Sequence, residues 1–232
     1  VWWDTREIKV TSASARLRRL AANRPPKPEP MITTRCLAVI PRLCQVRRHP
    51  YPLHGRLGCV NIVLIGMRGV GKTNIARRVS FLTKRPDMST DILVEYESGL
   101  GIPRFVELHG WAAFRQAEYD VIKKLSALDG LIVDGGGGIV VDLDDHGNEV
   151  FSDRKVGLLR AGGSIVFLRG DIDRLAAKVQ GDPSRPTLDA RRSAGALMRA
   201  RMPFYEAAAD WIIDVEGRQR SGIAEEIAKR YS

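Results

Sequence analysis

The stretch NIVLIGMRGVGKT, residues 61–73, decides the fold of this chain. Its first five residues form a short apolar run, which is typical of a buried β-strand. The next eight fit the phosphate-binding pattern G-x-x-x-x-G-K-S/T at every fixed position. Gly66, Gly69 and Gly71 allow the backbone to wrap an anion with its N–H groups pointing inward. The amphipathic residues 74–83 predict a helix whose positive N-terminal end points at the same phosphates.

Two side chains of this loop have definable chemistry. Lys72 supplies a point charge for the β- and γ-phosphates of a nucleotide, and Thr73 supplies a hydroxyl for Mg²⁺. Val70 and Asn74 flank them and belong to the same expected ATP site. A glycine-rich turn can match the pattern by chance, but a strand before it and a helix after it favour a nucleotide site. ATP and Mg²⁺ are therefore the expected cofactors.

Strands and helices are expected to alternate along the rest of this part of the chain. β-Prone apolar runs predict further strands, and longer stretches between them predict helices. The alternation indicates an α/β fold with a three-layer, doubly wound parallel sheet of about five strands. Ligands are then expected at the carboxyl ends of the strands. The expected strands are 131–134, 164–168 and 211–214, and the expected helices lie near 112–126, 171–180 and 189–208.

Charge and composition divide the chain near Cys59. Residues 1–59 hold 12 Lys and Arg against 3 Asp and Glu, together with seven of the 12 prolines and all three cysteines. Residues 60–232 are nearly neutral, with 25 basic and 24 acidic residues. We therefore expect a basic, Pro- and Arg-rich leader that is disordered, followed by one domain over residues 60–232. No run of 18 apolar residues predicts a membrane span, and the cytoplasm is the expected compartment.

The leader leaves several interpretations open. It can be dispensable or absent from the native product, since the chain starts with Val1 and its first methionine is Met31. A transit peptide is a second interpretation, although the many prolines fit it poorly. A nucleic-acid-binding arm is a third, but no nucleic-acid-binding motif accompanies the charge, so this partner is not expected.

Four possible zinc ligands occur in the leader at equal intervals. Cys44, His49, His54 and Cys59 follow the spacing C-x4-H-x4-H-x4-C. Structural zinc sites usually contain a tight C-x2-C pair that turns around the metal, and that pair is absent from this sequence. Coincidence is therefore favoured over a zinc site.

The motifs behind the phosphate loop resemble those of the shikimate kinase family. They are STDILVEYESG (89–99), HGWAAFRQAEY (109–119), the run DGGGG (134–138), DPSRPTL (182–188) and RARMPFY (199–205). Each motif is weak by itself, but together they cover residues 61 to about 230 in the family's order. The resemblance implies a nucleoside-monophosphate-kinase-like fold. It also implies transfer of the γ-phosphate of ATP to the 3-hydroxyl of shikimate, by a protein that we expect to be a monomer.

The resemblance assigns the substrate-binding residues. The family's two carboxylate-binding arginines match Arg115 and Arg201, and arginine forks suit a carboxylate. Asp91 matches the aspartate that contacts the hydroxyls, and it can orient the attacking hydroxyl and accept its proton. The glycine triplet matches Gly136, Gly137 and Gly138, whose bare backbone would form a floor with N–H groups for the hydroxyls. Each arginine also lies on an expected helix, so a solvated surface charge is the alternative reading of both.

Further arginines are expected near the nucleotide. Residues 91–119 form the expected substrate-binding region, and residues 178–190 resemble the mobile lid whose arginine approaches the transferred phosphate, here Arg185. Where the family stacks an arginine near the adenine, this chain has Lys178, which covers a ring less well. Arg218 and Arg220 fall in the other adenine-side loop, and Arg220 is included in the expected ATP site.

The metal site departs from the family pattern. The family usually has D-x-D on its second strand, whereas this chain has Ser89 and Asp91, so the first carboxylate is missing. Asp87 would face the same side as Ser89 on a strand. Asp134 is the better candidate, because it ends an apolar strand where P-loop enzymes place a Walker-B aspartate. We expect Asp134, together with Thr73, to be the acidic partner of Mg²⁺.

Residues 140–155 form a connection that is longer than is usual in the family. DDHGNE, residues 144–149, is typical turn chemistry between two short β-prone pieces, which predicts a small hairpin. Its acidic residues do not follow a calcium-loop spacing, so we expect a surface excursion.

Two other functions remain open on the sequence alone. One is a related kinase that acts on another carboxylate-bearing polyol or on a nucleotide. The other is a catalytically weak ATP-binding module whose basic leader binds nucleic acid, for which the departures at Ser89 and Lys178 leave room. The set Lys72, Asp91 and Arg115, with the two other matched arginines, argues against the second.

Overall fold

The computed structural model describes residues 60–179 and 193–231. The leader, its four possible zinc ligands and Arg185 with most of the expected lid lie outside the described residues.

The centre of the domain is a parallel sheet of five strands, as expected. Its order is β2-β3-β1-β6-β7, and every neighbouring pair is parallel. β1, the first strand among the described residues, lies in the middle, so the connections wind outward in both directions from it. The strands are β1 (Asn61–Ile65), β2 (Asp87–Ser89), β3 (Ile132–Asp134), β6 (Gly163–Arg169) and β7 (Trp211–Asp214).

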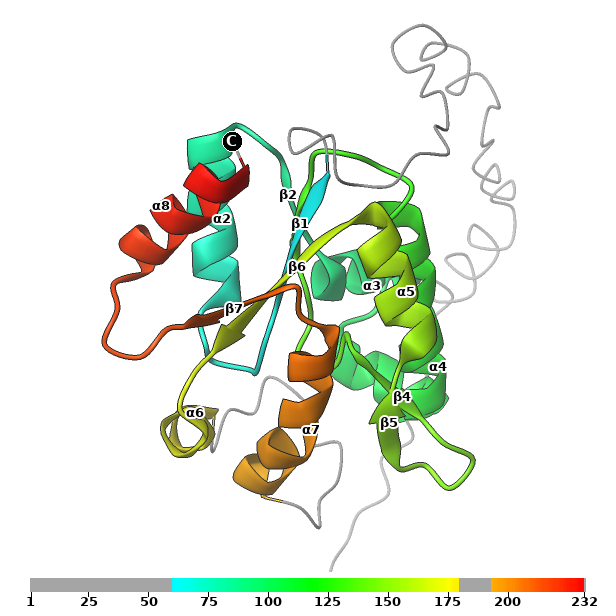
Figure 1. Ribbon diagram of the computed structural model, residues 1–232. Helices are drawn as coiled ribbons and strands as arrows, with labels where there is room; N and C mark the ends of the chain where they lie inside the picture. The colour runs from blue at the N-terminus through cyan, green and yellow to red at the C-terminus, as the bar shows by residue number, and fades with distance from the viewer. Residues whose placement is uncertain (1–59, 180–192, 232) are drawn as a thin grey trace, which may run out of the picture. The chain divides into compact units, whose positions relative to one another are not determined.

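Helices cover both faces of the sheet and complete the three layers. Helices α2 and α8 pack against each other on one side, and α4 and α5 lie on the other (Figure 1). The helices are α2 (Lys72–Thr83), α3 (Thr90–Ser98), α4 (Ile102–Leu125), α5 (Asp153–Gly162), α6 (Ile172–Val179), α7 (Ala194–Ala208) and α8 (Arg220–Tyr231).

Helix α4 begins ten residues before the expected start at residue 112. Gly110 interrupts it with a φ of 79°, which is a left-handed conformation that favours glycine. The kink at Gly110 divides the helix in two, and the expected start at residue 112 lies just after the kink.

The register of the sheet determines what meets at its carboxyl edge. All five residues of β1 are buried, as the apolar run predicted, and Ile62 and Leu64 are completely inaccessible to solvent. Asp134 at the end of β3 stands beside Leu64 of β1 on one side and Ser89 of β2 on the other. The loop after β1 therefore starts next to a carboxylate that is held by three packed strands.

The expected hairpin is confirmed. Strands β4 (Val141–Leu143) and β5 (Glu149–Phe151) pair antiparallel. Asp144 organises the turn, because its carboxylate accepts hydrogen bonds from the backbone N–H groups of His146 and Asn148 at 2.9 and 2.8 Å.

Among the helices that the structure describes, none combines the length and the apolar character needed to cross a membrane.

Candidate active site

The phosphate loop has the geometry that its glycines predict. Gly66, Gly69 and Gly71 have φ angles of 146°, 82° and 105°, which side chains rarely adopt. A Cβ on Gly66 would also lie 2.7 Å from the carbonyl oxygen of Leu168. The Lys72 ammonium donates hydrogen bonds to the carbonyls of Gly66 and Met67, at 2.9 and 3.1 Å. The loop is therefore already curved around its own lysine.

Thr73 and Asp134 meet beside this loop. The Thr73 hydroxyl donates a 2.6 Å hydrogen bond to Oδ2 of Asp134, whose residue is 6% exposed. Ser89, which occupies the position of the family's missing carboxylate, is the strand neighbour of Asp134 and caps α3 with its side chain. Asp87 is exposed and lies level with Ile132, two residues back from the carboxyl edge, so it is not a candidate for the metal.

The pair of Thr73 and Asp134 fits a magnesium site. Mg²⁺ in nucleotide enzymes usually takes one or two protein oxygens and fills its other positions with phosphate oxygens and water. Within residues 60–179 and 193–231 no three acidic, histidine or cysteine side chains gather to hold a metal by themselves. One carboxylate and one hydroxyl beside a phosphate loop suit that mode of binding.

Asp91 lies in the first turn of α3 and not on a strand, because β2 ends at Ser89. The helix turns Asp91 toward the glycine run, and a Cβ added to Gly136 would overlap its carboxylate. The glycine at 136 is thus needed for the close approach of Asp91.

The glycine floor differs from expectation in one respect. The N–H of Gly136 donates to the Thr90 hydroxyl at 2.9 Å, so it is not available to a substrate hydroxyl. A Cβ on Gly138 would overlap the guanidinium of Arg115, whereas Gly137 has no non-neighbouring atom closer than 3.8 Å to such a Cβ. Two of the three glycines therefore make room for side chains that were predicted to bind substrate.

Arg115 and Arg201 are both buried, so the surface-charge reading is wrong. Arg115 is 3% exposed and Arg201 is 9% exposed. They come from α4 and α7, and the glycine run joins them: Arg201 donates to the carbonyl of Gly137 at 2.8 Å, and Arg115 donates to that of Gly138 at 3.5 Å. The Tyr205 hydroxyl also donates to the Gly137 carbonyl, at 2.5 Å.

Two further ionisable side chains lie beside Arg115. Glu118, one turn along α4, accepts hydrogen bonds from Arg115 at 2.6 Å and from Lys155 of α5 at 3.1 Å. Burial by itself raises the pKa of Glu118, but Arg115 and Lys155 lower that pKa by more, so the carboxyl is held ionised. Sequence reasoning missed both residues, because a Lys on an amphipathic helix gives no sign that its ammonium is buried.

The hairpin was expected to be a surface excursion, and the position of Glu149 shows that this is wrong for one of its residues. Its side chain is 9% exposed and lies between the two arginines. It accepts hydrogen bonds from Arg115 Nη2 at 3.3 Å and from Arg201 Nε at 2.7 Å, and it also pairs with Arg201 Nη2. The turn sequence predicted the hairpin but not where the hairpin packs, since that depends on α4 and α7.

One cleft holds the phosphate loop and the predicted proton acceptor. Its volume is about 530 Å³, which is enough for a small molecule beside phosphates. Its lining includes Lys72, Thr73, Asp91, Asp134, Gly136, Gly137, Lys178 and Arg220.

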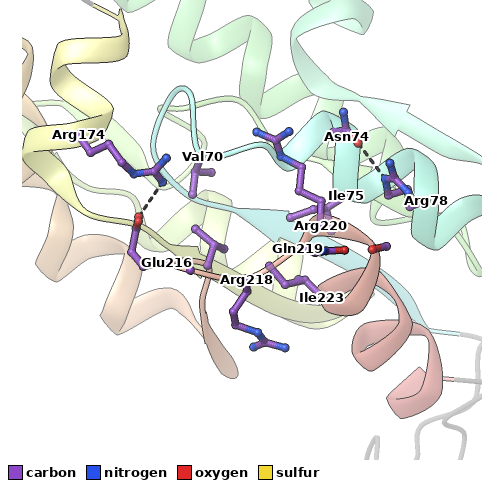
Figure 2. A pocket seen from close by; sticks show the side chains of 13 residues that line it. Val70, Asn74, Ile75, Arg78, Arg174, Glu216, Arg218, Gln219, Arg220 and Ile223 are labelled. Carbon is purple, nitrogen blue, oxygen red and sulfur yellow. Dashed lines mark hydrogen bonds and ion pairs between the residues drawn. The ribbon is translucent and has the colours of Figure 1, made fainter.

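A second pocket continues from this cleft along the start of α2 and the loop before α8. Figure 2 shows Arg174 joined to Glu216 at one end and Arg78 joined to Asn74 at the other, with Arg220 and Val70 between them. Its volume is about 400 Å³. Asn74 and Arg220 line both pockets, so the two pockets adjoin beside these residues.

Lys178 and Arg220 both approach the phosphate loop. The Lys178 ammonium donates to the carbonyl of Gly69 at 3.0 Å, and a Cβ on Gly71 would lie 2.9 Å from Nε of Arg220. Both positive groups stand where phosphates of a nucleotide are expected. Arg218 instead pairs with Glu226 of α8.

Comparison with known proteins tests the resemblance over most of the domain. Residues 68–232 match the family model described as shikimate kinase. The chain belongs to the shikimate kinase family. A shikimate kinase of Leptospira biflexa serovar Patoc is 43% identical over 169 residues, which are 72% of this chain and 93% of the relative. A shikimate kinase of Leptospira borgpetersenii is 39% identical over 159 residues, which are 67% of this chain and 89% of the relative.

Solved structures of the shikimate kinase family agree with the fold. A shikimate kinase from Acinetobacter baumannii in complex with shikimate has a TM-score of 0.63 and 25% identity, and it covers 73% of this chain and 91% of its own. As a member of the shikimate kinase family, this chain is a kinase with a P-loop, and ATP is the substrate that supplies the phosphate.

Proposed function

We propose that this chain transfers the γ-phosphate of ATP to the 3-hydroxyl of shikimate, in the kinase domain formed by residues 60–232. The observation that carries the proposal is the single cleft in which Asp91 faces the phosphate loop across the glycine floor. A phosphate donor and a hydroxyl acceptor can meet there, while the buried arginines beyond the floor suit a carboxylate on the acceptor.

Each residue then has a specific task. Asp91 orients the attacking hydroxyl and accepts its proton. Lys72, Lys178 and Arg220 place positive charge around the phosphates, which is most of what phosphoryl transfer needs from a protein. Arg185, which lies outside the described residues, is proposed to add a further positive charge from the lid.

Thr73 and Asp134 are proposed to hold Mg²⁺, directly or through water. Bound there, Mg²⁺ would supply positive charge that offsets the negative charge of the phosphates. Asp134 would thereby replace the carboxylate that is missing at Ser89, its neighbour in the sheet.

Replacing Asp134 by asparagine tests this assignment. We expect the Mg²⁺ concentration needed for half-maximal activity to rise about tenfold or more, because a neutral amide binds a hard cation more weakly than a carboxylate. Shikimate binding, measured by calorimetry, should change little. An unchanged Mg²⁺ dependence would show that Asp134 is not the acidic partner.

The acceptor is tested with a panel of compounds in a coupled assay of ADP release. Shikimate should stimulate ADP release, whereas a polyol acid without the cyclohexene ring and a nucleoside monophosphate should not. Stimulation by one of the other acceptors alone would support a related small-molecule kinase. ATP binding without stimulation by any acceptor would support a nucleotide-binding module.

A further inference from the structure

Glu149 occupies the donor positions of Arg201 that best suit a carboxylate. A guanidinium presents Nε and one Nη along one edge, and these two donors match the two oxygens of a carboxylate. Glu149 accepts from both donors of that edge in Arg201, and one of its oxygens also accepts from Arg115. The remaining nitrogen of Arg201 donates to the backbone carbonyl of Gly137. In this structure Arg201 therefore already binds a carboxylate that belongs to the chain.

Arg115 keeps one donor that Glu149 does not reach. Its Nε is buried and has no hydrogen-bond partner among the described residues. A buried guanidinium N–H without an acceptor costs free energy, and an acceptor atom on a ligand would remove that cost. Each guanidinium nitrogen of Arg201 thus donates to an acceptor, whereas Nε of Arg115 has no acceptor among the described residues.

The buried charges explain why a carboxylate is held here without substrate. Three basic side chains, Arg115, Lys155 and Arg201, surround the carboxylates of Glu118 and Glu149, and Asp142 lies 3.6 Å from the Lys155 ammonium. Removing Glu149 would leave the buried guanidinium of Arg201 without its carboxylate partner, which is costly in a poorly solvated site. A substrate carboxylate that replaced Glu149 would restore that pairing.

The position of Glu149 in the hairpin allows its carboxylate to move away from the arginines. Glu149 is the first residue of β5 and follows directly after the exposed turn residues 145–148. The other end of β5 is held by the bond from Ser152 N–H to the Val140 carbonyl and by the contact between Phe151 and Phe204. Glu149 thus lies next to the exposed turn end of the hairpin, so its side chain can withdraw without unpairing the end that is anchored at Phe151 and Ser152.

We propose that Glu149 is an internal carboxylate that competes with the substrate, and that shikimate binds by exchanging its own carboxylate for that of Glu149 at Arg201. This inference rests on the proposed function, because it requires an acceptor with a carboxylate. The exchange reduces the net gain from the substrate's charge, since one ion pair replaces another. Glu149 is therefore a residue that sets the affinity and the charge discrimination of the acceptor site.

Calorimetric titration of the full chain with shikimate tests the exchange in Glu149→Gln. An amide accepts fewer hydrogen bonds from a guanidinium edge and carries no charge, so the competitor is weakened. We expect the Kd for shikimate to fall about tenfold, because the binding-competent state becomes more populated. Asp145→Asn is the matched control, since it removes the same charge from an exposed position of the same hairpin, and it should leave the Kd unchanged.

The methyl ester of shikimate provides a second readout. The ester cannot take the place of a carboxylate at Arg201, so the ratio of its Kd to that of shikimate measures charge discrimination. This ratio should rise in Glu149→Gln and stay constant in Asp145→Asn. Glu149→Asp replaces Glu149→Gln in the titration if the latter proves too unstable. It keeps the charge of the cluster but shortens the side chain, and it should also tighten shikimate binding.

The outcomes separate this inference from the proposed function. If the wild type binds shikimate, and Glu149→Gln and Glu149→Asp bind it equally or more weakly, the exchange is overturned. That result would indicate that Glu149 holds the arginines in place for the substrate. Equal tightening in Asp145→Asn would also overturn it, because the effect would then be one of overall charge. Absence of shikimate binding to every variant and to the wild type would overturn both proposals.

Discussion

Replacing Asp91 by asparagine is expected to lower kcat about 10²–10⁴-fold, which is the range for loss of a general base. The carboxylate packs against Gly136 at the floor of the cleft, and it is the proposed acceptor of the proton that leaves the attacking hydroxyl. Asparagine has almost the same shape, so the floor should keep its geometry. Steady-state ADP release gives kcat, and the KM for ATP should change little because Asp91 is not proposed to contact the nucleotide.

Asp87→Asn is the matched control for this variant. Asp87 is exposed and lies on β2 at the opposite end from the cleft, so the same chemical change there should leave kcat unaffected. An Asp91→Asn enzyme with wild-type kcat would contradict the assignment of Asp91 as the proton acceptor.

Replacing Lys72 by methionine is expected to lower kcat/KM for ATP about 10²–10³-fold or more, as for other groups that stabilise charge in the transition state. Lys72 is at the first turn of α2, and its ammonium bridges the carbonyls of Gly66 and Met67. Methionine keeps the length of the side chain and removes both the charge and these hydrogen bonds. Steady-state kinetics with varied ATP measure the loss.

Lys123→Met controls for the loss of one positive charge. Lys123 is exposed in the last turn of α4 and lines neither pocket, so its replacement should preserve kcat/KM. If Lys72→Met and Lys123→Met had equal activity, the phosphate loop would not be the ATP site.

The fold was largely predictable because its signals are local. The apolar run 61–65, the glycines of the phosphate loop and the strand that ends at Asp134 are each specified within a few residues. The parallel sheet follows from their alternation with helices. The neighbouring positions of Asp134 and Ser89 were not readable in this way, because they depend on the register between β2 and β3.

The missed parts of the site depend on contacts between distant elements. Glu149 follows a turn sequence that looks solvated, yet α4 and α7 each bring an arginine to it. Lys155 lies on a helix with basic residues, and nothing in its neighbourhood signals that its ammonium would meet Glu118. The family resemblance identified the arginines but not their partner, since the hairpin is longer than the family's usual connection.

The central claim is that shikimate is phosphorylated at the cleft between the phosphate loop and Asp91. Incubation of the full chain with ATP, Mg²⁺ and shikimate, followed by phosphorus NMR of the product, tests it most directly. We predict a single phosphomonoester whose phosphorus couples to the ring proton at C3, and no such product with Asp91→Asn over the same time. Release of inorganic phosphate alone, or an unreacted mixture from a protein that binds ATP, would contradict the account.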